Sequence, residues 1–353
     1  MKMYRVLPRF LILSLAIVAA ACGNDPVEVP RGPFEQGVLI MNEGAFGAND
    51  GEVFHYDPQS GDMRTDIFEE VNGRPFAGLI QDMLLFEDRI YLVANTGKVE
   101  VVDAQSFQSV GSVNNGDLDI SRSLVRVGQK LFISDFGPYD DNFASPDSYV
   151  AVVRDPQGGT VAQKIPVSSA PEGMIFANGH LFVACTAGGV VEVIDPEAET
   201  LMESIPIEGG SPYFFLEYAG NTYLYARDSE SVYFHRINTQ DFQVIESIAI
   251  PLANSLWNGS HALGSGGEVF ILTSSGGGTS VAKVSLEEGT VLDESFYTGT
   301  NFYGLGYHSG AGQLYVGENA AWQGNGTVIK LDGNGGVVET LAAGRGPSGF
   351  LFR

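Results

Sequence analysis

Cysteine is almost absent from this sequence of 353 residues, which contains two, Cys22 and Cys185. Cys22 directly follows an N-terminal leader and is interpreted below as a lipid-anchored residue, so Cys185 has no free thiol to pair with in the mature chain. No disulfide framework supports the fold, and hydrophobic burial has to do so. A chain of this length with 44% apolar residues is sufficient for that. Cys185 follows an apolar run, residues 181–184, and is predicted to be a small buried residue and not a nucleophile.

Positive charge is also scarce. The chain has 19 Lys and Arg against 43 Asp and Glu, which gives a formal net charge of −24. Binding to nucleic-acid phosphates requires clustered Lys and Arg, so nucleic acid is excluded as a partner. We attribute the acidity to solubility or a saline habitat, with a cationic or neutral ligand as the alternative.

Familiar catalytic motifs are missing: there is no Gly-x-Ser-x-Gly elbow, His-Glu-x-x-His pair, P-loop or Cys-x-x-Cys pair. The five histidines lie singly in different repeats, which argues against a histidine-based metal or acyl-transfer centre: His55, His180, His235, His261 and His308. The acidic residues 140–142 with Asp147 lack the regular alternation of a calcium loop, and a solvated loop is preferred. We therefore predict no catalytic residue, no metal, no cofactor and no enzymatic activity.

The N-terminus has the order of a bacterial export signal. Lys2, Arg5 and Arg9 precede an apolar stretch, residues 10–21, that is too short to cross roughly 30 Å of hydrocarbon. Small residues then lead directly to Cys22, which we interpret as a lipobox cysteine carrying a lipid anchor. This predicts a signal peptide at 1–21, a lipid-anchored linker at 22–36 and a folded domain at 37–353. The alternative is an ordinary cleaved signal whose cysteine falls there by chance.

A short apolar run recurs seven times at intervals of 41–52 residues. The runs begin at Val38, Ile90, Leu131, Leu181, Tyr223, Val269 and Leu314. Each is followed by two further strand-like segments, and most repeats then pass through a Gly- or Pro-containing loop into an apolar fourth one. Four short strands per repeat, with turns rich in Gly, Asp and Asn and no helical periodicity after the leader, predict an all-β, seven-bladed β-propeller. A large sandwich or a β-helix is the alternative.

The two ends of the domain predict how the ring closes. The first repeat has no inner strand, because Val38 begins directly at a second strand, whereas residues 346–353 resemble a loop and an inner strand without a blade. We expect this C-terminal strand to complete the first blade. Such closure leaves no open sheet edge.

Loop length predicts the binding face. In a four-stranded blade the connections from strand two to three and from strand four to the next blade emerge on the same side. The two-to-three loops are long in three repeats, at 42–51, 135–147 and 318–326, and aromatic residues and amides gather in both classes of loop. Such side chains hold ligands by stacking and directed hydrogen bonds. The alternative for any single aromatic is that it plugs the channel mouth or packs between blades. The predicted ligand-binding residues are Asn42, Glu43, Phe46, Arg74, Phe76, Arg122, Tyr139, Tyr213, Trp257, Asn258, Tyr303 and Trp322.

Residues 41–47, 68–76, 81–83 and 98–103 together resemble a family of Bacteroidota surface lipoproteins, the YncE-like propellers that carry the domain of unknown function DUF5074. The BtuG-type members capture vitamin B12 and cap a TonB-dependent outer-membrane transporter. The resemblance implies a lipid-anchored protein of the outer membrane, exposed at the cell surface, with a corrinoid or other small-molecule ligand and such a transporter as partner. Residues 120–122 keep only the arginine of the family's Ser-Pro-Arg, and residues 81–83 replace its Gln-Ser-Met.

Two other functions remain open from the sequence. One is a protein-interaction scaffold of the cell envelope, and the other is a lactonase or lyase built on a propeller. The capture function is preferred, because it combines an anchor, a loop-rich face and the absence of catalytic motifs.

Overall fold

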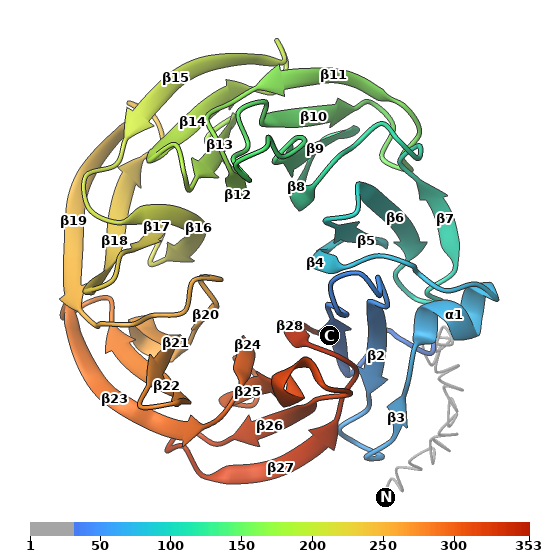
Figure 1. Ribbon diagram of the computed structural model, residues 1–353, viewed down its shortest axis with the longest axis vertical. Helices are drawn as coiled ribbons and strands as arrows, with labels where there is room; N and C mark the ends of the chain where they lie inside the picture. Colours follow the sequence, from blue (N-terminus) through green and yellow to red (C-terminus); the bar gives the residue numbers. More distant parts are fainter. Residues whose placement is uncertain (1–31) are drawn as a thin grey trace, which may run out of the picture. The chain divides into compact units, whose positions relative to one another are not determined.

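Seven four-stranded antiparallel sheets follow one another around a ring (Figure 1). The structure is a computed structural model that describes residues 32–353. The predicted signal peptide, the anchor Cys22 and most of the predicted linker lie outside the described residues. The seven-bladed β-propeller expected from the repeats is confirmed.

Within each blade the four strands are given below in order from the axis outward. Blades 1 to 4 consist of β28 (Pro347–Phe352), β1 (Val38–Asn42), β2 (Glu52–Tyr56) and β3 (Met63–Arg64); β4 (Ile80–Phe86), β5 (Arg89–Ala94), β6 (Lys98–Asp103) and β7 (Ser109–Ser112); β8 (Ser121–Val127), β9 (Lys130–Asp135), β10 (Tyr149–Val153) and β11 (Val161–Pro166); and β12 (Pro171–Ala177), β13 (His180–Cys185), β14 (Val190–Asp195) and β15 (Thr200–Pro206). Blades 5 to 7 consist of β16 (Ser211–Tyr218), β17 (Asn221–Arg227), β18 (Ser231–Asn238) and β19 (Gln243–Pro251); β20 (His261–Leu263), β21 (Glu268–Ser275), β22 (Gly278–Ser285) and β23 (Thr290–Gly299); and β24 (Phe302–His308), β25 (Gln313–Glu318), β26 (Thr327–Leu331) and β27 (Val337–Ala342).

The C-terminal strand closes the ring as predicted. β28 pairs antiparallel with β1, placing Val38 opposite Phe352 and Ile40 opposite Phe350. The first and last segments of the domain therefore share one sheet, and β1 has a partner on both sides. Phe34, which precedes β1, is fully buried in the cluster between blades 1 and 2, so the chain already packs against the propeller there.

The apolar runs of the sequence are the second strands of the blades, and they are continuous because both of their faces are buried. In β5, Ile90 and Leu92 pack in the cluster shared with blade 1, whereas Tyr91 and Val93 pack in the cluster shared with blade 3. All four side chains are fully buried. Successive residues of a strand point to opposite sides, so a strand between two blades needs apolar residues at every position.

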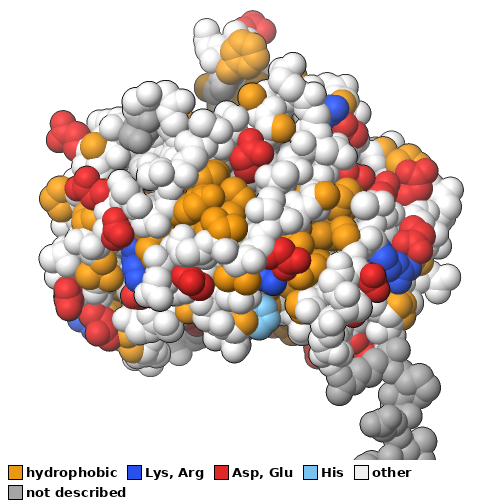
Figure 2. Space-filling model, turned by 90° about the horizontal axis from the view of Figure 1, so that it is seen from below, with side chains coloured by type: hydrophobic (Ala, Val, Ile, Leu, Met, Phe, Trp, Pro, Cys, Tyr) orange, Lys and Arg blue, Asp and Glu red, His pale blue; other side chains and the backbone are white. Residues whose placement is uncertain are grey.

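The outermost strands are exposed and irregular. Register shifts interrupt their pairing in blades 2 to 7, which makes these edges poor templates for another chain. Apolar and acidic side chains share the wall of the ring on the side where β23 and β27 lie (Figure 2). On these two strands Leu292, Val337 and Val338 are among the exposed apolar residues.

One short helix was not expected from the sequence. α1 (Ile67–Asn72) follows β3; the Asp66 side chain accepts a hydrogen bond from the Glu69 amide at its start, and Gly73 ends it in the left-handed conformation. Six residues are too few to show a helical period in the sequence, so α1 is compatible with the absence of helical periodicity after the leader and with the all-β fold. Two 3-10 turns, Ser265–Gly267 and Ala320–Trp322, are the other helical segments of the described chain.

None of the helices in residues 32–353 has the length and apolar character needed to cross a bilayer. Cys185 is fully buried, and burial raises the pKa of its thiol well above the usual range, so it is a core residue as predicted.

Candidate ligand-binding site

A β-bulge lies near the start of the inner strand in six of the seven blades. There the pairing with the second strand skips one residue, or two in blade 4. A bulge re-aims the side chain of the skipped residue. The skipped residues are Gln81, Arg122, Glu172 with Gly173, Tyr213, Tyr303 and Ser348. All of these positions except Gly173 and Tyr213 line a single pocket.

This central pocket has a volume of about 1230 Å³. Its floor comes from the bulge residues and its walls from four loops, β1–β2, β9–β10, β19–β20 and β25–β26. These loops belong to the two classes that the sequence assigned to the binding face.

Eight of the twelve predicted site residues line the central pocket: Glu43, Phe46, Arg122, Tyr139, Trp257, Asn258, Tyr303 and Trp322. They come from the β1–β2, β9–β10, β19–β20 and β25–β26 loops and from the starts of two inner strands. The pocket thus brings together residues that lie almost 280 positions apart in the sequence.

Asn42 and Phe76 are instead parts of the core. The fully buried Asn42 side chain accepts a hydrogen bond from the Gly344 amide at 2.9 Å and ties β1 to the last connection of the chain. Phe76 is 1% exposed and meets Phe68 edge to face at 5.7 Å. Because Phe76 packs against Phe68 in the core, it does not line the central pocket.

Arg74 and Tyr213 also lie outside the lining. Arg74 reaches outward to Glu100, with Nη2 2.6 Å from Oε1, and borders a second pocket. Tyr213 is a bulge residue, but the β19–β20 loop covers it: a Cβ on Gly259 would lie only 3.0 Å from the Tyr213 ring. Phe214, its neighbour, lines the pocket instead.

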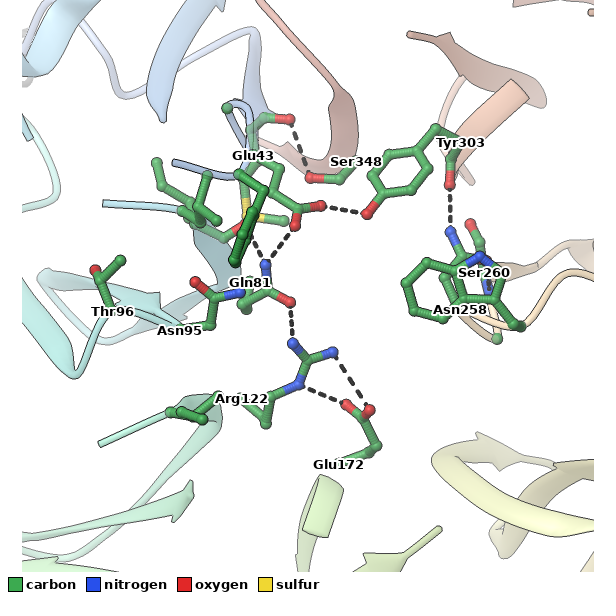
Figure 3. A pocket seen from close by; sticks show the side chains of 18 of the residues that line it. Glu43, Gln81, Asn95, Thr96, Arg122, Glu172, Asn258, Ser260, Tyr303 and Ser348 are labelled. Atoms are coloured by element: carbon green, nitrogen blue, oxygen red, sulfur yellow. Dashed lines mark hydrogen bonds and ion pairs between the residues drawn. The ribbon is translucent and has the colours of Figure 1, made fainter. Parts of the chain in front are cut away.

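A chain of hydrogen bonds crosses the floor of the pocket (Figure 3). Gln81 donates to Glu43 over 2.7 Å, and Arg122 donates to Gln81. The Arg122 guanidinium also donates two hydrogen bonds to the Glu172 carboxylate, from Nε at 2.9 Å and from Nη2 at 3.3 Å. Since each residue belongs to a different blade, this network links blades 1 to 4.

Tyr303 and Asn258 extend the network to the other side of the pocket. The Tyr303 hydroxyl donates to the second oxygen of Glu43, and the Asn258 side chain donates to the Tyr303 carbonyl at 3.0 Å. Through these contacts blades 6 and 7 join blades 1 to 4 at the floor (Figure 3).

Burial shapes the ionisation of these groups. It raises the pKa of the Glu43 carboxyl, although Tyr303, Gln81 and Arg122 oppose the shift. Burial alone would lower the pKa of Arg122, but the charge and hydrogen bonds of Glu172 outweigh it, so that pKa is raised. The pKa of His261, which also lines the pocket, is lowered by burial, so its imidazole is neutral at pH 7.

Aromatic side chains form the rim and are unusually exposed. Phe46 is 97% exposed, Phe143 84% and Trp257 70%. Trp322 is better supported, since its ring meets Tyr303 edge to face at 4.8 Å. Isolated exposed apolar residues are ordinary, but a group of them around one cavity marks an interaction site.

Sequence reasoning missed the pocket residues Gln81, Glu172, Asn95, Thr96 and His261. Gln81 lies in the segment 81–83 that carries the family resemblance, but nothing in a single sequence marks where a bulge places Gln81 or Glu172. Asn95 and Thr96 follow the second strand of blade 2 in a short turn, where loop length gives no indication of a site.

The ionisable groups on the floor of the pocket pair with one another. Among residues 32–353, no group of three or more His, Cys, Asp or Glu side chains is placed to hold a metal ion. The two floor carboxylates, Glu43 and Glu172, are each engaged with Gln81, Tyr303 or Arg122. The acidic loop folds on itself, with one Asp140 carboxylate oxygen accepting the amides of Asn142 and Ala144.

Fold and pocket together define a seven-bladed β-propeller with a large, aromatic-rimmed cavity on one end of the ring. Residues 36–333 match the model of a protein family described as a domain of unknown function, DUF5074. The chain belongs to this family. No curated protein matches the sequence.

Solved structures share the fold at low sequence identity. A quinonprotein alcohol dehydrogenase-like protein from Bacteroides thetaiotaomicron superposes with a TM-score of 0.68 at 15% identity, covering 90% of this chain and 78% of that one. A putative 6-phosphogluconolactonase from Bacteroides uniformis gives a TM-score of 0.63 at 11% identity, covering 90% and 99%. At such identities the likeness extends to the fold alone.

Proposed function

We propose that this protein is a cell-surface lipoprotein that captures a large nutrient ligand, a corrinoid or a similar cofactor-like or siderophore-like molecule, and passes it to a TonB-dependent outer-membrane transporter. In this proposal it binds without catalysing a reaction. The leader with Cys22 would supply the anchor and the central pocket the ligand site.

The size of the central pocket carries the proposal. Sites for drug-sized ligands occupy roughly 300–1,000 Å³. The volume of about 1230 Å³ exceeds that range and suits a larger molecule.

The chemistry of the walls supports a bulky, mostly neutral ligand with polar groups at its edge. Exposed aromatic rings offer flat apolar area that costs little conformational entropy to order. The side chains of Asn95, Thr96 and Ser260 line the pocket and have no hydrogen-bond partner within residues 32–353, so their amide and hydroxyl groups remain available. Arg122 is neutralised by Glu172, which leaves the floor without a free cation.

A titration of the purified protein tests the proposal. Adding a coloured corrinoid should change its visible spectrum or release heat, with saturation at one ligand per chain and a micromolar or lower dissociation constant. A ferric siderophore serves as the second probe. No binding of either at micromolar concentration would remove the capture function.

A protein-interaction scaffold of the cell envelope is the second candidate, and the protruding rings of Phe46 and Phe143 favour it. It predicts no small-molecule binding and co-purification with an outer-membrane protein that is lost in a Phe46→Ala, Phe143→Ala double variant. A lactonase or lyase is the third candidate. Metal analysis and product assays on the pure protein would detect it.

A further inference from the structure

A second pocket, of about 430 Å³, adjoins the central one, and Thr96 lines both. This side pocket is bordered by Arg74 and Ala77 from the connection between blades 1 and 2, by Lys98 and Glu100 on β6, and by Asn115. It opens on the same end of the ring as the central pocket, because its loops belong to the same two classes. The two pockets are therefore neighbours on one end of the ring.

Two cations are held in fixed positions at the side pocket. The Arg74 guanidinium carbon lies 4.9 Å from the centre of the Phe68 ring, and the Lys98 ammonium lies 4.5 Å from that of Phe76. The two rings are themselves packed edge to face. Stacking on buried aromatic rings restricts both side chains, so less freedom is lost when a ligand binds.

One carboxylate faces these two cations. Glu100 is 2% exposed, and its Oε1 accepts hydrogen bonds from Arg74 at 2.6 Å and from Ser109 at 2.5 Å. The side pocket thus holds two positive charges and one negative charge, in a chain whose formal net charge is −24. This local reversal of sign has no counterpart on the floor of the central pocket, where Arg122 faces Glu43 and Glu172.

Lys98 is incompletely paired. Its ammonium has three N–H groups, and the Phe76 carbonyl is the one hydrogen-bond acceptor that it contacts within residues 32–353. Burial lowers the pKa of this ammonium, with Glu100 opposing and Arg74 reinforcing the shift. An anion placed beside Lys98 would offset the cost of burying the charged ammonium.

We infer that the side pocket binds an anionic group, a carboxylate or a phosphate, at the incompletely paired Lys98 ammonium, with the Arg74–Glu100 pair beside it. Because Thr96 lines both pockets, we assign this group to one end of the ligand that fills the central pocket. That second step rests on the proposed function, whereas the anion site does not.

Inorganic phosphate tests the anion site by itself. In an NMR titration at low salt, phosphate should shift the side-chain signals of Lys98 and Arg74 and leave those of Arg122 unchanged. Lys98→Met should weaken this binding about tenfold, the usual loss for one charge-assisted hydrogen bond. Lys98→Arg keeps the positive charge and should bind phosphate more tightly than Lys98→Met, which separates loss of charge from loss of fold.

The matched control is Lys164→Met, which removes the same charge from a lysine on the outer strand β11, 43% exposed and paired with Asp119. It should bind phosphate like the wild type. Shifts that are absent at tens of millimolar phosphate, or equal affinities in wild type and Lys98→Met, would overturn the anion site.

A pair of corrinoids tests the link to the central pocket. Cobalamin carries a phosphodiester and cobinamide lacks it, so Lys98→Met should weaken cobalamin about tenfold and leave cobinamide unchanged. Equal effects on both corrinoids would overturn the assignment to one ligand. Phosphate binding that depends on Lys98, without binding of either corrinoid, would instead remove the proposed ligand and leave the anion site standing.

Discussion

Arg122 is the residue on which the floor of the central pocket depends. Its guanidinium lies between Gln81 and Glu172, with side-chain exposures of 20% and 13% for the Arg122–Glu172 pair. Removing one partner of a largely buried ion pair leaves the other desolvated and unpaired. The pair therefore specifies the geometry of the floor even where its net contribution to stability is small.

We expect Arg122→Met to lower the free energy of unfolding by about 3 kcal/mol, the lower end of the range for breaking buried pairs, since the guanidinium retains some contact with solvent. Urea denaturation measures this directly. The control is Arg64→Met, which removes an exposed pair with Glu70 and should cost under about 1 kcal/mol. Equal losses in the two variants would contradict the structural role of Arg122.

Glu52 provides a prediction on pH. Burial and the nearby Asp66 and Asp50 raise the pKa of its carboxyl from 4.5 to about 7. A carboxyl whose pKa is higher in the folded state stabilises the fold while it is protonated, and this stabilisation is lost as pH rises from about 4.5 to about 7. Glu52→Gln should therefore be more stable than the wild type at pH 8 and show no such gain at pH 4. Parallel pH profiles of thermal unfolding would contradict this.

At the scale of elements, the second strands were the predictable part of the fold. Runs such as residues 90–93 are apolar at every position because blades pack on both of their faces. Closure by β28 was predictable for a related reason, since residues 346–353 form a strand with no blade of its own. α1 was not, because six residues carry too little pattern.

The site was predictable only in part, and the reason lies in two kinds of element. Long loops indicated the correct end of the ring and rim residues such as Phe46 and Trp257. The bulges that aim Gln81 and Glu172 at the axis depend on register between strands, which one sequence does not record. Arg74 and Phe76 were predicted to bind the ligand but do not line the central pocket. Phe76 packs on Phe68, and one sequence does not record such a tertiary contact.

The contact between the C-terminal strand β28, in blade 1, and the neighbouring blade 7 provides a prediction at the scale of elements. Phe350 of β28 packs against Tyr315 of the last blade, with ring centres 5.7 Å apart. We expect Phe350→Ala to lower the free energy of unfolding by about 2–3 kcal/mol, less than for a fully buried phenylalanine. Val338→Ala, on the exposed β27, should change it by no more than about 0.5 kcal/mol. Equal stabilities by urea denaturation would mean that β28 does not secure the ring.

For the whole molecule, the structure places an apolar rim above a floor whose buried charges are paired. The long β1–β2, β9–β10 and β25–β26 loops and the β19–β20 connection stand around the same end of the ring, whereas the opposite end has short hairpins such as residues 87–88. The inner and second strands thus form a rigid framework, and the long loops at one end of the ring form a surface whose residues can vary without disturbing that framework. Loops on a rigid scaffold are where binding residues commonly lie.

The most direct test of the central claim is a corrinoid titration of two single variants beside the wild type. Trp257→Ala removes a 70% exposed ring of the central pocket, and Phe176→Ala removes a 41% exposed ring on the inner strand β12, outside the pocket lining. If the central pocket is the ligand site, Trp257→Ala should weaken binding about tenfold or more, and Phe176→Ala should leave it unchanged. Binding that is equally strong in both variants would place the ligand elsewhere and contradict the account.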